Sequence, residues 1–145
     1  MKKSLMAFAL LSLAACSGNS DFNRYNNPFG TGTFPVANDG QAALYLVRDV
    51  SSPDAPPINI TLNDAPVGGL PPSSYMRLNL DPRLYDFRAY GSQANNELIV
   101  TVAPGQTRFL LAQPTPSGSA ELLELSQEQG RRLVRKGQAI EPMAY

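Results

Sequence analysis

The chain has 145 residues, and its 12 lysines and arginines balance 12 aspartates and glutamates, so its formal net charge is 0. This length suits one domain, and the charge gives no excess of basic groups for binding nucleic acid. The absence of histidine excludes Ser-His catalytic arrangements and the commonest zinc ligand, and a single cysteine excludes a disulfide framework.

The N-terminus has the pattern of an export signal. Lys2 and Lys3 precede an apolar run over residues 5–15, which as a helix would span about 16 Å against about 30 Å of bilayer core. The run ends at Leu13-Ala14-Ala15-Cys16, where polar residues begin. These four residues resemble the bacterial lipobox, which implies a lipid thioether on Cys16, cleavage before it and acylation of the new amino group. The alternative, a buried apolar cysteine, fits the polar residues that follow less well.

We therefore predict a signal peptide over residues 1–15 and a lipid anchor at Cys16 in the bacterial envelope. Loss of Lys2 and Lys3 lowers the basic count from 12 to 10, so the mature chain carries about −2. A net charge of this sign and size indicates neither nucleic-acid binding nor a polybasic patch for anionic lipid. Because Ser17 is not an aspartate, which would resemble an inner-membrane retention signal, we expect the outer membrane, facing the periplasm.

Residues 16–40 are predicted to be a lipidated flexible tether. They are rich in asparagine, glycine, serine and proline and show no apolar period. Their aromatic residues either dock on the membrane or the domain, or recognise a partner: Phe22, Tyr25, Phe29 and Phe34.

Residues 41–137 predict a small antiparallel β-sandwich of about seven or eight strands with one short C-terminal helix, because short runs of period two alternate with turn residues. The strands are expected at 42–48, 58–62, 66–70, 75–80, 85–90, 97–102, 107–112 and 120–125. The first run is typical of a central strand, and the third, with its two glycines, of an edge strand. Three inward sets should share one core: Ile58/Ile60/Leu62, Met76/Leu78/Leu80 and Tyr85/Phe87/Ala89.

The helix is expected at residues 127–136, with Ser126 and Gln129 as a capping box and Gly137 at its end. Gly130 costs about 1 kcal/mol relative to alanine, so the helix should be packed, not free-standing. Leu133 and Val134 are its expected buried contacts, and residues 138–145 are expected to form a tail. Four cations form either a binding patch or a solvated helix end: Arg131, Arg132, Arg135 and Lys136.

The order of these segments carries a resemblance. The segments that carry it are Ile60-Thr61-Leu62-Asn63-Asp64-Ala65-Pro66-Val67-Gly68-Gly69-Leu70, Ser74-Tyr75, Asp81-Pro82, Tyr85-Asp86-Phe87-Arg88-Ala89, Leu98-Ile99-Val100, Phe109-Leu110-Leu111 and Glu128-Gln129-Gly130-Arg131-Arg132-Leu133. Together they resemble an uncharacterised bacterial lipoprotein domain family and are similar to small PEGA-type surface domains. The resemblance implies a fold and a compartment but no activity. Arg83 stands where that family's turn has glycine, so a type I turn is expected here.

The turn Asp81-Pro82-Arg83-Leu84 predicts a hairpin between strands 75–80 and 85–90. Its register places Arg77 opposite Arg88 and Tyr75 opposite Tyr90 on the outer face. Either water and a diagonal Asp86 relieve the two like charges, or the four residues form a contact patch for an anionic group of a partner.

Two pairs of carboxylates could in principle act in glycoside hydrolysis: Asp81/Asp86 and Glu121/Glu124. Asp81 precedes a proline in a turn and Asp86 alternates outward on a strand, while Glu121 and Glu124 flank two apolar residues. We therefore expect no catalytic pair. We also expect no cofactor and no metal site, and we expect that the protein is not an enzyme. The sequence instead favours a structural or interaction lipoprotein with an envelope protein as its partner. The alternative is a small ligand-binding module for glycan or peptidoglycan fragments.

Overall fold

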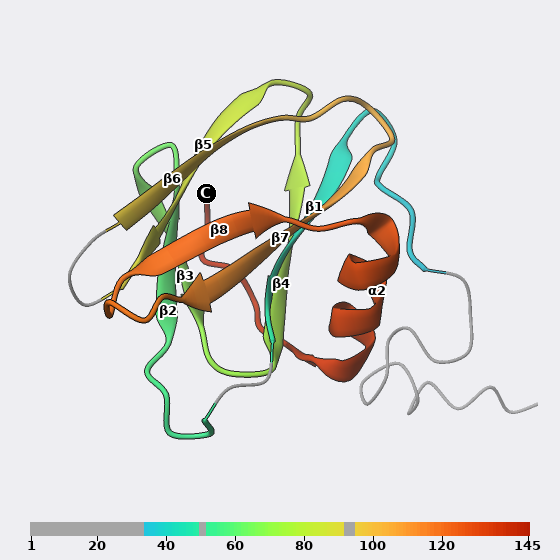
Figure 1. The fold of residues 1–145 in the computed structure, drawn as a ribbon. Helices are drawn as coiled ribbons and strands as arrows, with labels where there is room; N and C mark the ends of the chain where they lie inside the picture. The colour runs from blue at the N-terminus through green and yellow to red at the C-terminus, as the bar shows by residue number, and fades with distance from the viewer. Residues whose placement is uncertain (1–33, 50–51, 92–94) are drawn as a thin grey trace, which may run out of the picture.

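Two β-sheets pack face to face, with one helix over one of them, in the computed structural model of the protein, which describes residues 34–49, 52–91 and 95–145 (Figure 1). Sheet A has the order β8-β7-β1-β4-β9, and sheet B has the order β3-β2-β5-β6. Sheet A consists of β1 (Ala42–Arg48), β4 (Ser74–Leu80), β7 (Thr107–Pro114), β8 (Ala120–Glu124) and β9 (Gln138–Ala139). Sheet B consists of β2 (Ile58–Leu62), β3 (Ala65–Leu70), β5 (Leu84–Tyr90) and β6 (Asn95–Thr101), and the helix is α2 (Gln127–Lys136).

The predicted β-sandwich with one short helix is confirmed. All eight expected strands are present, with ends within two residues of those predicted, and α2 has its expected bounds. β1 is central in sheet A and β3 is an edge strand of sheet B, as expected. Sheet A is mixed and not purely antiparallel, because β1 pairs with β7 and β4 pairs with β9 in parallel.

One apolar core lies between the sheets, and all three predicted inward sets belong to it. Phe87 and Leu78 are fully buried there, one from each sheet. The period of two along these strands places alternate side chains toward the same interior. β1 departs from this rule because it is buried on both sides, as its continuous apolar run indicates.

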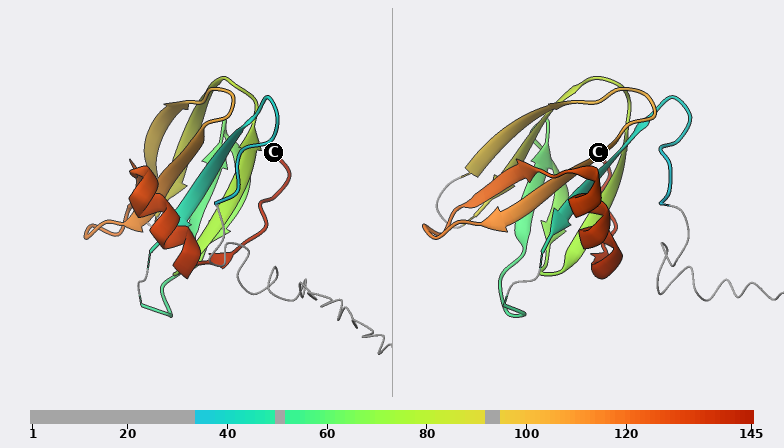
Figure 2. Two further views of the ribbon diagram at one scale, coloured as in Figure 1. Left: turned by 90° about the vertical axis from the view of Figure 1, so that its right-hand side faces the viewer. Right: turned by 45° about the vertical axis from the view of Figure 1, so that its right-hand side comes forward.

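A second, smaller cluster lies between sheet A and α2. Its buried members are Ala43, Tyr45, Val47, Tyr75, Phe109 and Val134, and Phe34 and Leu133 pack against them. The predicted capping box begins the helix: the Ser126 hydroxyl accepts from the Gln129 amide at 3.2 Å, and the Gln129 side chain accepts from the Ser126 amide at 3.3 Å. The buried contacts expected at Leu133 and Val134 are present. α2 therefore covers the outer face of sheet A (Figure 2).

Contacts of the sandwich extend past both expected boundaries, Gly40 and Gly137. Phe34, placed in the tether by its sequence, packs its ring 5.2 Å from the Tyr45 ring. On the other side, β9 pairs with β4, the Met143 amide donates to the Val67 carbonyl at 2.8 Å, and the Tyr145 hydroxyl accepts from the Asn79 amide at 2.9 Å. Segment 138–145 thus links β4 of sheet A to the edge strand β3 of sheet B and is not a free tail.

The predicted hairpin between β4 and β5 is wrong. β4 pairs with β1 and β9, whereas β5 pairs with β2 and β6, so the chain crosses from one sheet to the other at Asp81–Arg83. The reason is geometric. Two strands that face each other across a core have the same alternation as two strands paired in one sheet, so the pattern of apolar residues does not distinguish them.

Candidate functional site

The structure does not bring the four residues of the predicted contact patch together. Tyr75 and Arg77 lie on the outer face of sheet A, where their partners in register on β1 are Val47 and Tyr45. Arg88 and Tyr90 lie on the outer face of sheet B, and Arg88 pairs with Thr61 on one side and Glu97 on the other. The predicted juxtaposition of Arg77 with Arg88 is therefore wrong.

Tyr75 and Arg77 have structural surroundings. Tyr75 is only 4% exposed, and its burial and the neighbouring Tyr45 raise its pKa to about 12. The Arg77 guanidinium donates to the Val36 carbonyl at 2.9 Å and lies 5.9 Å from the centre of the Tyr45 ring. Both residues thus help to hold the segment at Phe34–Val36 and the Tyr45 ring on sheet A. Tyr75 is buried, and Arg77 is half-buried with its guanidinium already engaged.

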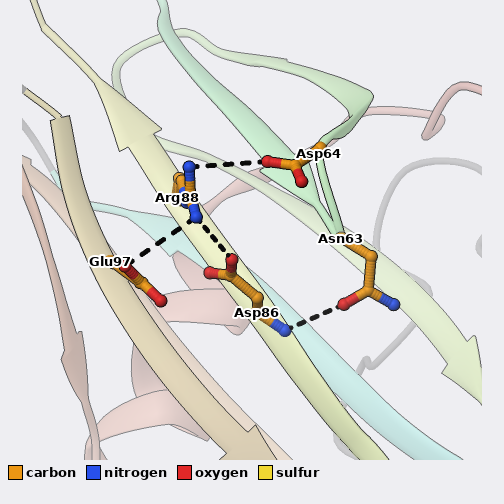
Figure 3. Close-up of polar contacts among 5 residues, drawn as sticks. All are labelled: Asn63, Asp64, Asp86, Arg88 and Glu97. Carbon is orange, nitrogen blue, oxygen red and sulfur yellow. Dashed lines mark hydrogen bonds and ion pairs between the residues drawn. The ribbon is translucent and has the colours of Figure 1, made fainter.

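Arg88 lies instead in a polar cluster on sheet B, which we call the Arg88 cluster: Asn63, Asp64, Asp86, Arg88 and Glu97 (Figure 3). Its guanidinium donates to the Asp86 carboxylate at 2.9 Å, and it lies 3.4 Å from the Asp64 carboxylate and 3.8 Å from that of Glu97. The hydrogen bond to Asp86 raises the pKa of Arg88, and the charges of Asp86, Asp64 and Glu97 act in the same direction.

Local sequence explains how the Arg88 cluster forms. Asn63 and Asp64 both have positive φ, 48° and 66°, at the two-residue turn between β2 and β3, a conformation in which asparagine and aspartate are favoured. The Asn63 side chain accepts from the Asp86 amide at 3.0 Å, which fixes the turn against β5. The sequence indicates the turn at Asn63-Asp64, but the sequence reasoning assigned neither Asp64 nor Glu97 to a site. Glu97 comes to lie opposite Arg88 through the pairing of β5 with β6, which the sequence does not specify.

The Arg88 cluster changes the expected chemistry of this surface. Three carboxylates surround one guanidinium, so the cluster carries about −2 and Arg88 is already paired. An arginine in this state is a poor receptor for the anionic group that the sequence reasoning assigned to it. The same face carries the half-buried Tyr90 and two large apolar side chains that are exposed to solvent. Leu84 has 58% of its surface exposed, and Ile99 has 49%. It therefore combines acidic and apolar groups.

No model of a known protein family matches this chain, and no curated protein matches it. Cys16, its lipobox and the aromatics Phe22, Tyr25 and Phe29 lie outside the described residues, so the lipid anchor stays a prediction. In the described part of the chain, no helix is long and apolar enough to cross a bilayer.

The carboxylates considered as catalytic pairs have separate partners. Asp81 accepts from the Gln41 side chain at 3.2 Å, and Asp86 accepts from Arg88. Glu121 accepts from Gln113, and Glu124 forms an ion pair with Arg108. Among the described residues no group of three acidic, histidine or cysteine side chains is placed to hold a metal ion.

One cavity of about 280 Å³ lies at the end of the sandwich where β4 crosses to β5. The turn after β2, the crossover and Tyr145 form its walls, and its charged groups are Asp81 and Arg83. The guanidinium of Arg83 lies 4.8 Å from the centre of the Tyr85 ring. Its volume is just below the range of about 300–1,000 Å³ that is common for small-molecule sites. The ligand-binding alternative would be tested at this cavity.

The four cations of α2 lie on the sheet A side of the molecule, and each of them is exposed. The Arg131 guanidinium lies 5.4 Å from the centre of the Phe34 ring, so it borders the point where the N-terminal segment joins the sandwich. The alternative of a cationic patch on this helix thus has a defined surface.

Proposed function

We propose that the protein is a lipid-anchored bacterial envelope lipoprotein that acts as a non-catalytic structural and interaction module. The outer face of sheet B is its contact surface. The observation that carries the proposal is an asymmetry. The helix α2 lies over sheet A (Figure 2), where the segment at Phe34 also packs, whereas the outward side chains of β5 on sheet B are half-buried or exposed.

The lipid anchor in this proposal rests on the sequence Leu13-Ala14-Ala15-Cys16. Cys16 stands 18 positions before Phe34, and a chain of that length spans at most about 60 Å when fully extended. The proposed site is the outer membrane, with the sandwich in the periplasm. Phe34, the first described residue after Cys16, packs against Tyr45 and Phe109 on the sheet A side, which supports an attachment of the sandwich from that side.

The chemistry of the sheet B face favours a protein as the partner. Leu84 and Ile99 supply exposed apolar area, and the Arg88 cluster next to them supplies fixed charges. Protein interfaces combine such an apolar centre with charged groups that set the orientation of the partner.

Site-specific photocrosslinking in the native envelope tests this surface. A benzophenone amino acid at position 90 replaces Tyr90 on the sheet B face, and the matched control carries it at position 135 in place of exposed Arg135 on α2. We expect one discrete protein adduct from position 90 and not from position 135. Equal adducts from both positions, or none from position 90, would refute the proposed contact surface.

Intact mass spectrometry of the membrane-extracted protein tests the anchor. The mass is expected to correspond to a chain that begins at acylated Cys16, and Cys16→Ala should abolish acylation. An unmodified mature mass in a host that lipidates proteins would contradict the proposal.

A further inference from the structure

Charge is distributed unevenly over the mature chain. Within α2, four cations stand against the single carboxylate of Glu128, a local charge of +3. Since the mature chain carries about −2, the remainder carries about −5. The net charge of the whole sequence therefore conceals a local cationic surface, made of the four cations that the sequence leaves open as a binding patch or a solvated helix end.

The four cations lie along one exposed side of α2. Arg131 and Arg135 are four positions apart, as are Arg132 and Lys136, so they form two adjacent rows on the helix. Gly130 and Val134 on the other side are buried against sheet A. All four cations border one open hollow along the helix. We call this surface, made of Arg131, Arg132, Arg135 and Lys136, the α2 cationic face.

The α2 cationic face lacks internal neutralisation. Within the described ranges 34–49, 52–91 and 95–145, no carboxylate forms an ion pair with any of its four cations. By contrast, Arg88 and Arg108 are paired with acids. Four cations on one helix face repel one another, and an external anionic surface would relieve that repulsion.

We propose that the α2 cationic face binds the phosphate groups of an anionic lipid bilayer. This inference rests on the proposed function, because the bilayer is the one to which Cys16 is anchored. Phe34 is the first described residue after Cys16 in the chain, and its ring centre lies 5.4 Å from the Arg131 guanidinium. The described end of the chain nearest to Cys16 and the cations thus lie on the same side of the sandwich. A lipid anchor at Cys16 and this surface would act as two signals, as in stable peripheral binding.

This contact orients the sandwich. Figure 1 shows α2 on the side of sheet A, with sheet B on the opposite side of the sandwich. With sheet A and α2 toward the bilayer, the Arg88 cluster on the outer face of sheet B points away from it. The carboxylates around Arg88 would be repelled by anionic headgroups, which disfavours the reverse orientation. The surface proposed for the protein partner is thereby presented to the periplasm.

Vesicle sedimentation tests the proposal without the lipid anchor. The probe is the full mature chain with Cys16→Ser, mixed with vesicles of phosphatidylcholine alone or with an added third of phosphatidylglycerol, at low salt. One variant carries Arg132→Gln, Arg135→Gln and Lys136→Gln. Its control carries Asn59→Asp, Thr101→Glu and Ser117→Asp, which change the net charge by the same amount at exposed positions outside α2.

We expect binding to the anionic vesicles only, and a loss of about 100-fold in partition coefficient for the α2 variant, because each surface cation near an anionic bilayer contributes about 5-fold. The control should lose far less. Equal binding to both vesicle types, or equal losses in the two variants, would overturn the proposal, as would retention of the chain through α2 on an anionic polymer but not on vesicles. The chain in this assay has no acyl group, so a failed lipidation experiment and a failed vesicle experiment are separate results.

Discussion

Gly130 of α2 lies so close to Phe109 of β7 that a Cβ atom on Gly130 would come within 2.1 Å of the ring carbon Cγ of Phe109. This approach explains a residue that an isolated helix disfavours by about 1 kcal/mol relative to alanine. The absence of a side chain lets the helix axis come close enough to sheet A for Val134 to be buried. The cost in helix propensity is thus offset by packing.

Gly130→Ala is expected to destabilise the protein by about 1–3 kcal/mol, because overlap with the Phe109 ring outweighs the gain in helix propensity. Urea denaturation measures the change in the free energy of unfolding. Arg132→Ala, on the exposed side of the same helix, should change it by no more than about 0.5 kcal/mol. A more stable Gly130→Ala variant would contradict the packing.

Leu78→Ala should cost about 2–5 kcal/mol, since Leu78 is fully buried between the sheets and its truncation leaves a cavity. Asn79, the next residue of β4, points to the outer face of sheet A, and Asn79→Ala should cost about 0.5 kcal/mol or less. The comparison uses thermal and urea unfolding of both variants. Similar costs at the two positions would mean that the register of β4 is wrong.

Arg48, only 3% exposed, joins the two sheets: its guanidinium donates to the carbonyls of Pro56 and Leu70, each at 2.7 Å. Arg48→Met keeps an apolar stem but leaves both carbonyls without this donor, so we expect a loss of about 2–4 kcal/mol in the free energy of unfolding. Arg132→Met on the exposed side of α2 is the matched control and should be close to neutral. Equal unfolding midpoints for the two variants would show that Arg48 does not hold the sheets together.

A double-mutant cycle distinguishes the observed sheets from a β4–β5 hairpin. Arg77→Ala and Arg88→Ala should be additive in the free energy of unfolding, because the residues lie on outer faces of different sheets. Arg88→Ala and Asp86→Ala should show coupling, because their side chains are hydrogen-bonded at 2.9 Å. Coupling between Arg77 and Arg88, without coupling between Arg88 and Asp86, would support a β4–β5 hairpin and contradict the observed sheets.

Burial of Tyr75 predicts a loss of stability at high pH. Its pKa is raised to about 12 in the folded chain, whereas an unfolded tyrosine titrates near 10. The folded chain therefore keeps a proton that the unfolded chain loses, so this stability is present below pH 10 and is lost as the pH rises through 12. Two pH units correspond to about 2–3 kcal/mol. Tyr45, whose pKa burial also raises, acts in the same direction.

Urea unfolding between pH 9.5 and 12 measures this effect. Tyr75→Phe lacks the titrating hydroxyl, so its free energy of unfolding should fall less steeply with pH than that of the natural chain. Tyr90→Phe, half-buried on sheet B, serves as the control. If Tyr75→Phe and the natural chain show the same slope, the burial of Tyr75 does not produce the pH dependence.

Local patterns in the sequence determined which residues form each strand and which of them face the core. The alternation of apolar and polar residues at Ile58–Leu62 and at Leu84–Tyr90 depends only on the two sides of a strand. The helix capping box at Ser126 and Gln129 depends only on residues that are neighbours in the chain. These features are local, so the sequence alone sufficed for them, and for the lipobox at Cys16 as a prediction.

The tertiary structure alone decided which strands pair. Asp81–Arg83 looks like a hairpin turn in sequence, but the chain crosses there between sheets, because apolar alternation is the same for paired strands and for strands that face each other across a core. That choice separated Arg77 from Arg88 and surrounded Arg88 with three carboxylates from β5, β6 and the turn after β2. Such contacts come from segments far apart in the chain, and no pattern within one segment specifies them.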